Sequence, residues 1–359
     1  MTTMAEVARL AGVSATTVSH VLNKTRKVAP ETEELVLQAV AQTGYRHNLA
    51  ARALATQSTD TIGLAMSVVT NPYFAELVRD VDRLLRRSGY TMILADTNDD
   101  PLVETEVINH LLARRVSGLI VSPLEGTAEL TSGLRQLLDD GFPLLLLDRR
   151  STLPCDQVYS ECVDSVYHLT AHLAAQGHRR IGFVRGNMTT MSAQDRFAGY
   201  RKAVAELGLD DDPRLVIAGE SDEQITEQRV TAHLSAADEP ATALVVANNQ
   251  MTLGTMRAIR QCRLKVARDI ALVCYDDFEW ADLFDPRITA MAQDAAALAA
   301  RAVDLLLARI DSPDRPPQTV TVPTEFHHRD SCGCGRRKHR GRPDVRAVAS
   351  CDVHHHRAR

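Results

Sequence analysis

Residues 3–23 read TMAEVARLAGVSATTVSHVLN, and their pattern predicts how the first part of the chain folds. Thr3, followed three residues later by Glu6, predicts a capping box, in which each side chain accepts a hydrogen bond from the other residue's backbone N–H. Gly12 predicts the end of this first helix, and Ser14 is a favoured N-cap for a second one. Within the first helix, apolar side chains recur at helical spacing at Val7, Leu10 and Ala11.

The second helix should run from Ala15 to about Leu22, with an inner face made of Val13, Val18 and Val21. Two short helices joined by a glycine-containing turn form a helix-turn-helix pattern, whose second helix enters the DNA major groove by its N-terminal end. Hydroxyl, imidazole and methyl groups can contact base edges, so we expect DNA contacts from Ala15, Thr16, Thr17 and His20. A third helix should begin at Pro30 and end at Gly44, with an apolar face of Leu35, Val36, Ala39 and Val40.

This N-terminal segment resembles the headpiece of the lactose-repressor (LacI/GalR) family over residues 4–23, and residues 18–26 are similar to its purine-repressor branch. The similarity continues through Val28, Thr32, Gly44, Tyr45, Asn48, Ala51, Arg52 and Leu54. It implies a sequence-specific regulator of transcription, by family habit a repressor, that binds a palindromic double-stranded DNA operator as a homodimer. It also implies DNA contacts from Ser14, Asn23, Arg26, Asn48 and Arg52. The alternative is a helical bundle with no role in DNA binding.

The same resemblance implies a hinge helix at Asn48–Ala55 that forms on DNA, with Leu54 wedged between base pairs in the minor groove. The segment is too short to be a stable helix alone in water, so a partner and DNA would be needed to order it. Many family members carry Arg or Lys where this chain has Ala55, which implies weaker electrostatic attraction to the minor groove here. An ordinary buried leucine is the alternative for Leu54.

Composition sets outer limits on the chain. Its 359 residues, 45% of them hydrophobic, suffice for two or three domains, and we expect no signal segment, no membrane span and a cytoplasmic location. The seven cysteines are scattered and odd in number, which favours reduced thiols over a disulfide framework. The net charge of the whole chain is -5, although the tail at 336–359 carries eight Lys or Arg against two acids. The part of the chain before this tail must therefore be acidic.

After a polar linker, apolar runs alternate with helical patterns in two series. The expected strands are 61–66, 91–95, 118–121 and 144–147, then 181–184, 216–217, 244–247 and 270–274. Helices are expected near 72–88, 103–115, 129–140, 192–207 and 251–262. Continuous apolar strands alternating with helices predict parallel sheets covered on both faces, and two series predict two doubly wound subdomains.

Polar residues follow each apolar run, as they should if a ligand lies beyond the carboxyl ends of the strands. Asn71, Asp148, Asn248 and Asn249 are such residues, and so is Asp276. This arrangement resembles the periplasmic sugar-binding fold, which LacI-family regulators carry as their effector domain. The fold class expected for the whole chain is therefore an all-α helix-turn-helix headpiece plus an α/β periplasmic-binding-protein-like core of two doubly wound parallel-sheet subdomains.

Arg196 and Asp276 match family positions that hydrogen-bond the effector. A guanidinium and a carboxylate suit a polyhydroxylated ligand, so we expect a sugar, with a purine or another small metabolite as the alternative. Tyr73, Phe74 and Trp280 could stack on the ligand's apolar face. Other roles stay open: an interhelical ion pair for Arg196, loop capping for Asp148 and Asp276, and local packing for Trp280.

These patterns divide the chain into four parts: the headpiece at 1–47, the hinge and linker at 48–60, the effector-binding and dimerisation core at 61–335, and a basic tail at 336–359. Metal binding by Cys332, Cys334 and the tail histidines is conceivable, but their spacing fits no standard zinc site, so we expect neither metal nor cofactor. Nonspecific attraction of the tail to phosphate is an alternative to its having no role.

Two other functional classes compete with a DNA-binding regulator. A solute-binding protein for transport would begin with a signal peptide and lack a headpiece, and this sequence shows the reverse. An enzyme is disfavoured because no Gly-x-Gly-x-x-Gly, P-loop, Gly-x-Ser-x-Gly or metal-ligand cluster stands at a suitable place.

Overall fold

The computed structural model describes residues 3–23, 26–45, 59–67, 72–124, 128–236 and 239–334. The chain divides into two compact units, Met1–Thr59 and Asp60–Arg359. The hinge helix expected at 48–55 and the tail expected at 336–359 lie outside the described residues. In the described part, no helix is both long enough and apolar enough to span a bilayer.

The described residues of the first unit form the helices α1 (Met4–Ala11), α2 (Ala15–Asn23) and α3 (Pro30–Thr43). The capping box is confirmed: the backbone N of Thr3 donates to Oε2 of Glu6 at 2.8 Å, and the N of Glu6 donates to the Thr3 hydroxyl at 3.3 Å. The residues Gly12 and Gly44 follow α1 and α3 with φ of 65° and 61°, the left-handed conformation that glycine adopts without strain.

The core of this unit consists of Val7, Ala8, Ala11, Val18, Val21, Val36 and Ala39. One expectation was wrong: Leu35, predicted on the inner face of α3, is 52% exposed. The buried stripe of α3 runs through Val36 and Ala39 with Val40 beside it, and a residue directly before Val36 is rotated about 100° away from that stripe.

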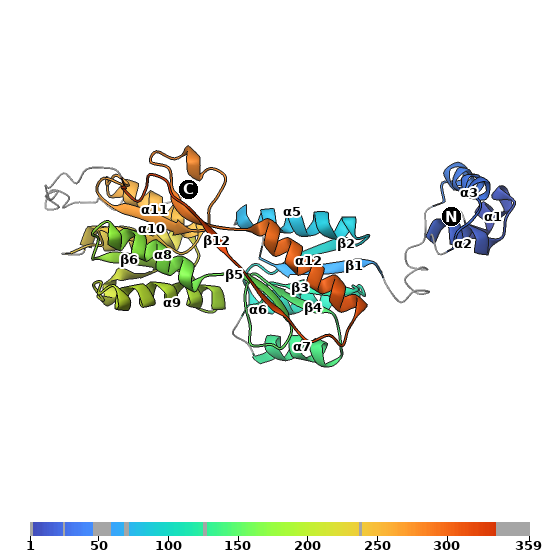
Figure 1. The fold of residues 1–359 in the computed structure, drawn as a ribbon, viewed down its shortest axis with the longest axis horizontal. Coiled ribbons are helices and arrows are strands. Elements are labelled where there is room, and N and C mark those ends of the chain that lie inside the picture. Colours follow the sequence, from blue (N-terminus) through green and yellow to red (C-terminus); the bar gives the residue numbers. More distant parts are fainter. Residues whose placement is uncertain are drawn as a thin grey trace, which may run out of the picture. The chain divides into compact units, whose positions relative to one another are not determined.

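The second unit contains two six-stranded sheets, which lie in separate halves of this unit (Figure 1). The first sheet has the order β11-β5-β4-β3-β1-β2 and is parallel throughout. Its strands are β1 (Thr61–Met66), β2 (Thr91–Asp96), β3 (Gly118–Val121), β4 (Leu144–Leu147), β5 (Asp156–Ser160) and β11 (Thr319–Val322). One face is covered by α5 (Pro72–Arg87) and α12 (Ala295–Asp311), the other by α6 (Pro101–Ala113) and α7 (Ala128–Asp139). We call this half the N-subdomain.

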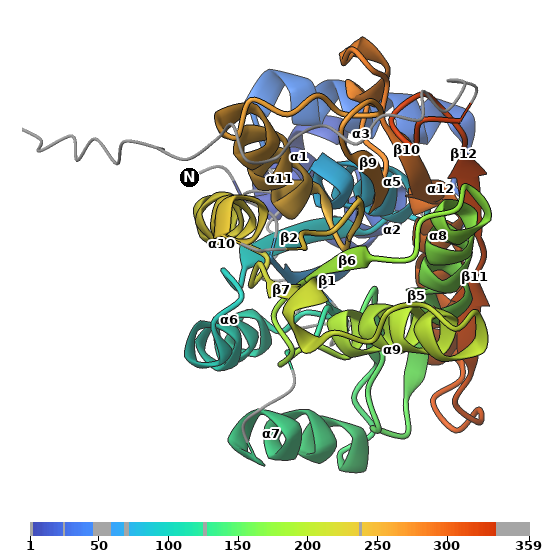
Figure 2. The ribbon, with the colours of Figure 1, turned by 90° about the vertical axis from the view of Figure 1, so that its left-hand side faces the viewer.

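The second sheet has the order β12-β10-β9-β8-β6-β7 and is parallel except for the antiparallel edge strand β12. Its strands are β6 (Ile181–Arg185), β7 (Val216–Ala218), β8 (Ala243–Val246), β9 (Ala271–Tyr275), β10 (Thr289–Gln293) and β12 (Thr324–His327). The helices α8 (Val163–Ala175) and α9 (Met191–Glu206) pack together, as do α10 (Glu223–Ala236) and α11 (Asn249–Gln261) (Figure 2). Two short 3-10 helices, η1 (Pro213–Leu215) and η2 (Ala281–Leu283), complete this C-subdomain.

Both predicted series of parallel strands are confirmed, but β5, β10, β11 and β12 were not foreseen. These strands are short and mix polar with apolar residues, so no continuous apolar run marks them. The polar start of β5 is buried because Nε of Arg309 on α12 lies 3.0 Å from Oδ2 of Asp156. An ion pair between residues 153 positions apart leaves no local pattern in the sequence.

Within the described residues, the chain crosses between the two subdomains three times, at residues 161–162, at Asp294 and at Pro323. Pro323 alone separates β11 of the first sheet from β12 of the second. The first crossover is anchored to the C-subdomain, because the Tyr275 hydroxyl donates to the carbonyl oxygen of Glu161 at 2.9 Å.

The fold buries one carboxyl group in the N-subdomain, and this predicts a pH dependence of stability. Glu104 of α6 is fully buried, and its carboxylate accepts from the backbone N of Leu124 at 3.1 Å. Burial raises the pKa of Glu104 from 4.5 to about 7, despite that hydrogen bond. Between these values the folded chain keeps a proton that the unfolded chain releases, so the free energy of unfolding should fall as pH rises from about 4.5 to about 7, by at most about 3 kcal/mol.

Glu104→Gln should remove this contribution while keeping an oxygen that accepts from Leu124. Urea unfolding of both proteins between pH 4.5 and pH 8 should therefore show the variant's free energy of unfolding increasing relative to that of the wild type as pH rises. Glu106→Gln, at an exposed position of the same helix, serves as the control and should follow the wild type. Parallel curves for Glu104→Gln and wild type would contradict the assignment.

Candidate functional site

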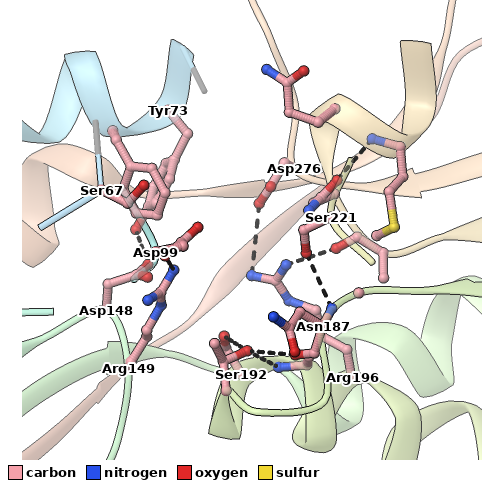
Figure 3. Close-up of a pocket in the computed structure, with 18 of the residues that line it drawn as sticks. Ser67, Tyr73, Asp99, Asp148, Arg149, Asn187, Ser192, Arg196, Ser221 and Asp276 are labelled. Carbon is pink, nitrogen blue, oxygen red and sulfur yellow. Dashed lines mark hydrogen bonds and ion pairs between the residues drawn. The ribbon is translucent and has the colours of Figure 1, made fainter. Parts of the chain in front are cut away.

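A polar pocket of about 250 Å³ lies between the two subdomains, beyond the carboxyl ends of their strands. In each sheet the strand order reverses beside the first strand, at β1–β3 in one and at β6–β8 in the other, and ligands bind at such switch points. Of the predicted effector residues, the structure places six in the pocket wall: Tyr73, Phe74, Asp148, Arg196, Asn248 and Asp276. Figure 3 shows Asp148 and Arg149 facing Arg196 and Asn187 from opposite sides.

The N-subdomain side of the pocket is built around Asp148, which directly follows β4. Its backbone adopts φ 71°, a left-handed conformation that aspartate tolerates better than most residues, and this turns its side chain at the end of the strand. The buried Tyr73 hydroxyl donates to Oδ1 of Asp148 at 2.9 Å. Burial raises the pKa of Asp148, although Arg149 and Arg196 oppose the rise. Next to it, Nη2 of Arg149 lies 2.7 Å from Oδ1 of Asp99.

The C-subdomain side is built around Arg196 of α9. Its Nη1 donates to the carbonyl oxygen of Ala247 at 2.7 Å, and its guanidinium carbon lies 3.9 Å from the centre of the Tyr275 ring. Its Nη2 lies 4.0 Å from Oδ1 of Asp276. Burial acts to lower the pKa of Arg196, but the neighbouring carboxylate of Asp276 and other groups outweigh it, and the pKa is raised. The guanidinium therefore stays charged.

Asp276 repeats the geometry of Asp148 at the end of β9. Its backbone has φ 73°, and Nε2 of Gln293 donates to its Oδ1 at 2.6 Å. Non-glycine residues held in this region of backbone space gather at functional sites. Two carboxylates turned in this way, one from each subdomain, thus border the same pocket.

Two donors of the pocket's arginines lack an acceptor among the residues that the structure describes, the buried Nε of Arg196 and Nη1 of Arg149. Leaving a buried donor without a partner costs about 1–3 kcal/mol, and more when the group is charged. Both atoms are closed off from solvent in this structure, so a ligand could reach them only after the surrounding side chains move. The polar side chains that line the pocket suit a polar ligand.

The other predicted effector residues are placed differently. Asn248 lies at the wall but also caps α11, because its Oδ1 accepts from the backbone N of Met251 at 2.9 Å. Asn249 is buried and does not line the pocket, and Asn71 is outside the described residues. Trp280 lies outside the wall, 39% exposed, with its ring 5.0 Å from that of Phe278. This is the local packing that was its alternative.

Several wall residues were not assigned to the effector site from the sequence. They follow strands β1, β2, β4, β6 and β7, as the rule on carboxyl ends would suggest, and they are Ser67, Asp99, Arg149, Asn187, Glu220 and Ser221. Gln293, at the end of β10, was missed because that strand was not foreseen. The signal for the others was present, but many polar loop residues share it.

In the headpiece, the predicted DNA contacts cluster at the start of α2. Oγ of Ser14 accepts from the backbone N of Thr17 at 3.1 Å and lies 2.9 Å from the Thr17 hydroxyl. Ala15 and Thr16 are exposed, whereas Thr17 and His20 are half-buried, and Arg26 is exposed. The side chain of Asn23 and the residues Asn48, Arg52 and Leu54 lie outside the described part.

Comparison with known protein families finds a match in each of the two units. Residues 3–48 match "Bacterial regulatory proteins, lacI family", and residues 170–332 match "Periplasmic binding protein-like domain". The HTH-type transcriptional repressor PurR of Haemophilus influenzae (strain PittEE) is 34% identical over 318 residues, which cover 89% of this chain and 94% of that protein.

Solved structures show the same similarity. The lac repressor dimer bound to operator and the anti-inducer ONPF matches with a TM-score of 0.82 and 29% identity, over 92% of this chain and 99% of that one. The complex of the transcriptional regulator CelR with cellobiose matches with a TM-score of 0.69 and 27% identity, over 92% and 100%. This chain therefore belongs to the lacI family of bacterial regulatory proteins, and it is a DNA-binding regulator of transcription and not an enzyme.

Proposed function

We propose that this protein represses transcription in the cytoplasm by binding, as a homodimer, to a palindromic operator, and that a small molecule in the pocket between its subdomains controls this binding. The observation that carries the proposal is the pocket wall, in which Arg196 and Asp276 of one subdomain lie opposite Asp148 of the other. A molecule that contacts both sides favours one arrangement of the subdomains over others, which is what control of a second site requires.

The chemistry of the pocket favours a sugar as the effector. Carboxylates only accept hydrogen bonds, and the hydroxyl groups of a sugar can donate to Asp148 and Asp276 while accepting from Arg196. The ring of Phe74 in the same wall suits the apolar face of a pyranose. The similar regulator CelR was solved with cellobiose, which agrees with this class of ligand.

A purine is the second candidate, and two observations favour it. Relatives named PurR are 34% identical over most of this chain, and two aromatic side chains, Tyr73 and Phe74, line the pocket. A flat base could stack on the ring of Phe74 and hydrogen-bond the same arginine and carboxylates. Thermal-shift titrations with sugars and with purine bases decide between the two, since only a bound ligand raises the melting temperature.

Operator binding is assigned to the N-terminal end of α2. The exposed Ala15 and Thr16 present a methyl and a hydroxyl group there, held in place by the cap at Ser14. The lac repressor structure, solved as a dimer on its operator, supports the same mode of binding here. Two subunits would place two α2 helices in successive major grooves.

Thr16→Ala is expected to weaken operator binding without unfolding the headpiece, because Thr16 is exposed and contributes nothing to the core. Loss of a base contact costs about 1–3 kcal/mol, which corresponds to a loss of roughly 5- to 150-fold in affinity. Fluorescence anisotropy with DNA from upstream of the protein's own gene would measure it. Gln42→Ala, at an exposed position of α3, is the control. Equal affinity of Thr16→Ala and wild type would argue against this contact.

Arg196→Lys is expected to weaken effector binding at least tenfold while operator binding persists, so that the ligand no longer changes the affinity for DNA. Lysine keeps the charge but loses the planar fork that reaches several acceptors at once. Calorimetry with the ligand found by thermal shift gives the affinity. The matched control is Arg179→Lys. Arg179 is exposed and lies just before β6, at the end of that strand away from the pocket. If both lysine variants bound the ligand as the wild type does, the pocket would not be the effector site.

A further inference from the structure

Four potential metal ligands meet in the C-subdomain, away from the effector pocket. They are His172 near the end of α8, His328 directly after β12, and Cys332 and Cys334 in the segment that follows. The ligand atoms of all four lie within 4.8 Å of one another. Among the residues that the structure describes, this is the one group of three or more such side chains that could hold a metal ion.

The pairwise distances are close to those of a tetrahedral site. Sγ of Cys332 lies 3.4 Å from Nε2 of His328, and Sγ of Cys334 lies 3.3 Å from Nε2 of His172. Zinc bound at the usual lengths to sulfur and nitrogen places those two atoms about 3.6 Å apart. The four ligands therefore need to move by only a few tenths of an ångström along these two edges to enclose an ion.

The backbone holds the two cysteines in place. Ser331, between His328 and Cys332, is fully buried: its hydroxyl donates to the carbonyl oxygen of Leu272 at 2.7 Å and accepts from the backbone N of Thr289 at 2.8 Å. Gly333 then takes φ 78°, and a Cβ there would lie 3.1 Å from the carbonyl oxygen of Ala267. This glycine lets the chain turn between the two cysteines. Cys332 then contacts His328, and Cys334 contacts His172.

The aromatic surroundings fix the histidine rings as well. The His172 ring lies 5.2 Å from that of Phe326 and 5.2 Å from that of His328. Phe326 and His328 are in turn stacked, with ring centres 5.9 Å apart and planes at 27°. The ligands thus come from three anchored places: a helix, the end of an edge strand and a tight turn.

We propose that His172, His328, Cys332 and Cys334 form a structural Zn²⁺ site. Two thiolates and two neutral imidazoles neutralise the charge of a divalent ion, and four protein ligands leave no open position, as in structural rather than catalytic zinc sites. Both thiols give up their protons to solvent when the ion binds. Thiolate ligands exclude Mg²⁺ and Ca²⁺, which take oxygen ligands. The ion would tie the segment after β12 to the end of α8.

Sequence spacing could not reveal this group. A Cys-x-Cys pair alone fits no standard zinc pattern, and one of its partners, His172, lies 162 residues before Cys334. Only the packing of α8 beside the segment after β12 brings the four side chains together. The site does not depend on the proposed effector or on DNA binding.

The test is the zinc content of the full chain, purified with a non-thiol reductant and without metal-affinity steps, then dialysed against metal-free buffer. We expect about one zinc ion per chain by plasma mass spectrometry. Cobalt added to the apo-protein should give the visible bands and the sulfur-to-metal absorption of a tetrahedral thiolate site. Titration of apo-protein with zinc should also raise the melting temperature, because the ion binds the folded state.

Cys334→Ser and His328→Ala should each lower the zinc affinity, measured against a chromophoric chelator, by at least about 100-fold. Loss of a partner behind a ligand already costs 10- to 100-fold, so loss of a ligand should exceed that. His328 is exposed, so its alanine variant should fold even if a cysteine variant does not.

Two controls separate this site from others. Cys262→Ser, at a buried cysteine of α11's end, should leave the zinc content unchanged. So should a full-length chain with His339→Ala, Cys351→Ser, His354→Ala, His355→Ala and His356→Ala, which removes the cysteine and histidine ligands of the tail. Zinc lost from the tail variant, zinc kept by His328→Ala at wild-type affinity, or a Cys332–Cys334 disulfide in acid-quenched, zinc-free protein would overturn the proposal.

Discussion

The burial of a guanidinium at Arg196 is the constraint around which the pocket is arranged. A charge out of water costs several kcal/mol unless groups of opposite charge and hydrogen-bond acceptors surround it. Here the carbonyl oxygen of Ala247, the face of Tyr275 and the carboxylate of Asp276 supply that surrounding. Asp276 can reach this position only because the chain turns left-handed directly after β9. The arrangement of this side of the pocket therefore follows from satisfying one buried charge.

The sequence predicted the architecture well because its signals are local. Caps, glycine stops and apolar runs each lie within a few residues, and they placed the helices of the headpiece and the central parallel strands. The rule that polar residues follow strands also found Asp148 and Asp276. It failed at Trp280, because the direction of a loop after its first residues depends on packing, and here the ring packs on Phe278 instead of facing the pocket. It gave Arg149 no effector role, although that residue follows Asp148 directly, because nothing local distinguishes an inward arginine from an exposed one.

What could not be predicted rests on contacts between distant residues. The edge strands β5 and β11 carry polar residues, and they are held by contacts such as that of Arg309 with Asp156, 153 positions apart. The cluster of His172 with Cys334 spans a similar distance. In both cases the residue types are visible in the sequence, but their proximity is produced by the crossovers between the subdomains. A spacing rule that covers a dozen residues cannot detect contacts between residues so far apart in the sequence.

The same crossovers connect the pocket to the proposed metal site. Tyr275, which lies under Arg196, donates through its hydroxyl to the carbonyl oxygen of Glu161 at the first crossover. The carboxylate of Glu161 accepts from the backbone N of Ser165 at 2.7 Å and so caps the start of α8. The Ser165 hydroxyl lies 2.6 Å from that of Thr324, directly after the third crossover. The elements α8 and β12 are thus joined where they leave the crossovers, and an ion at His172 and His328 would join them again at their far ends. With such an ion bound, α8 and β12 would be fixed to each other at both ends, and a change at Arg196 would then reach both crossovers together.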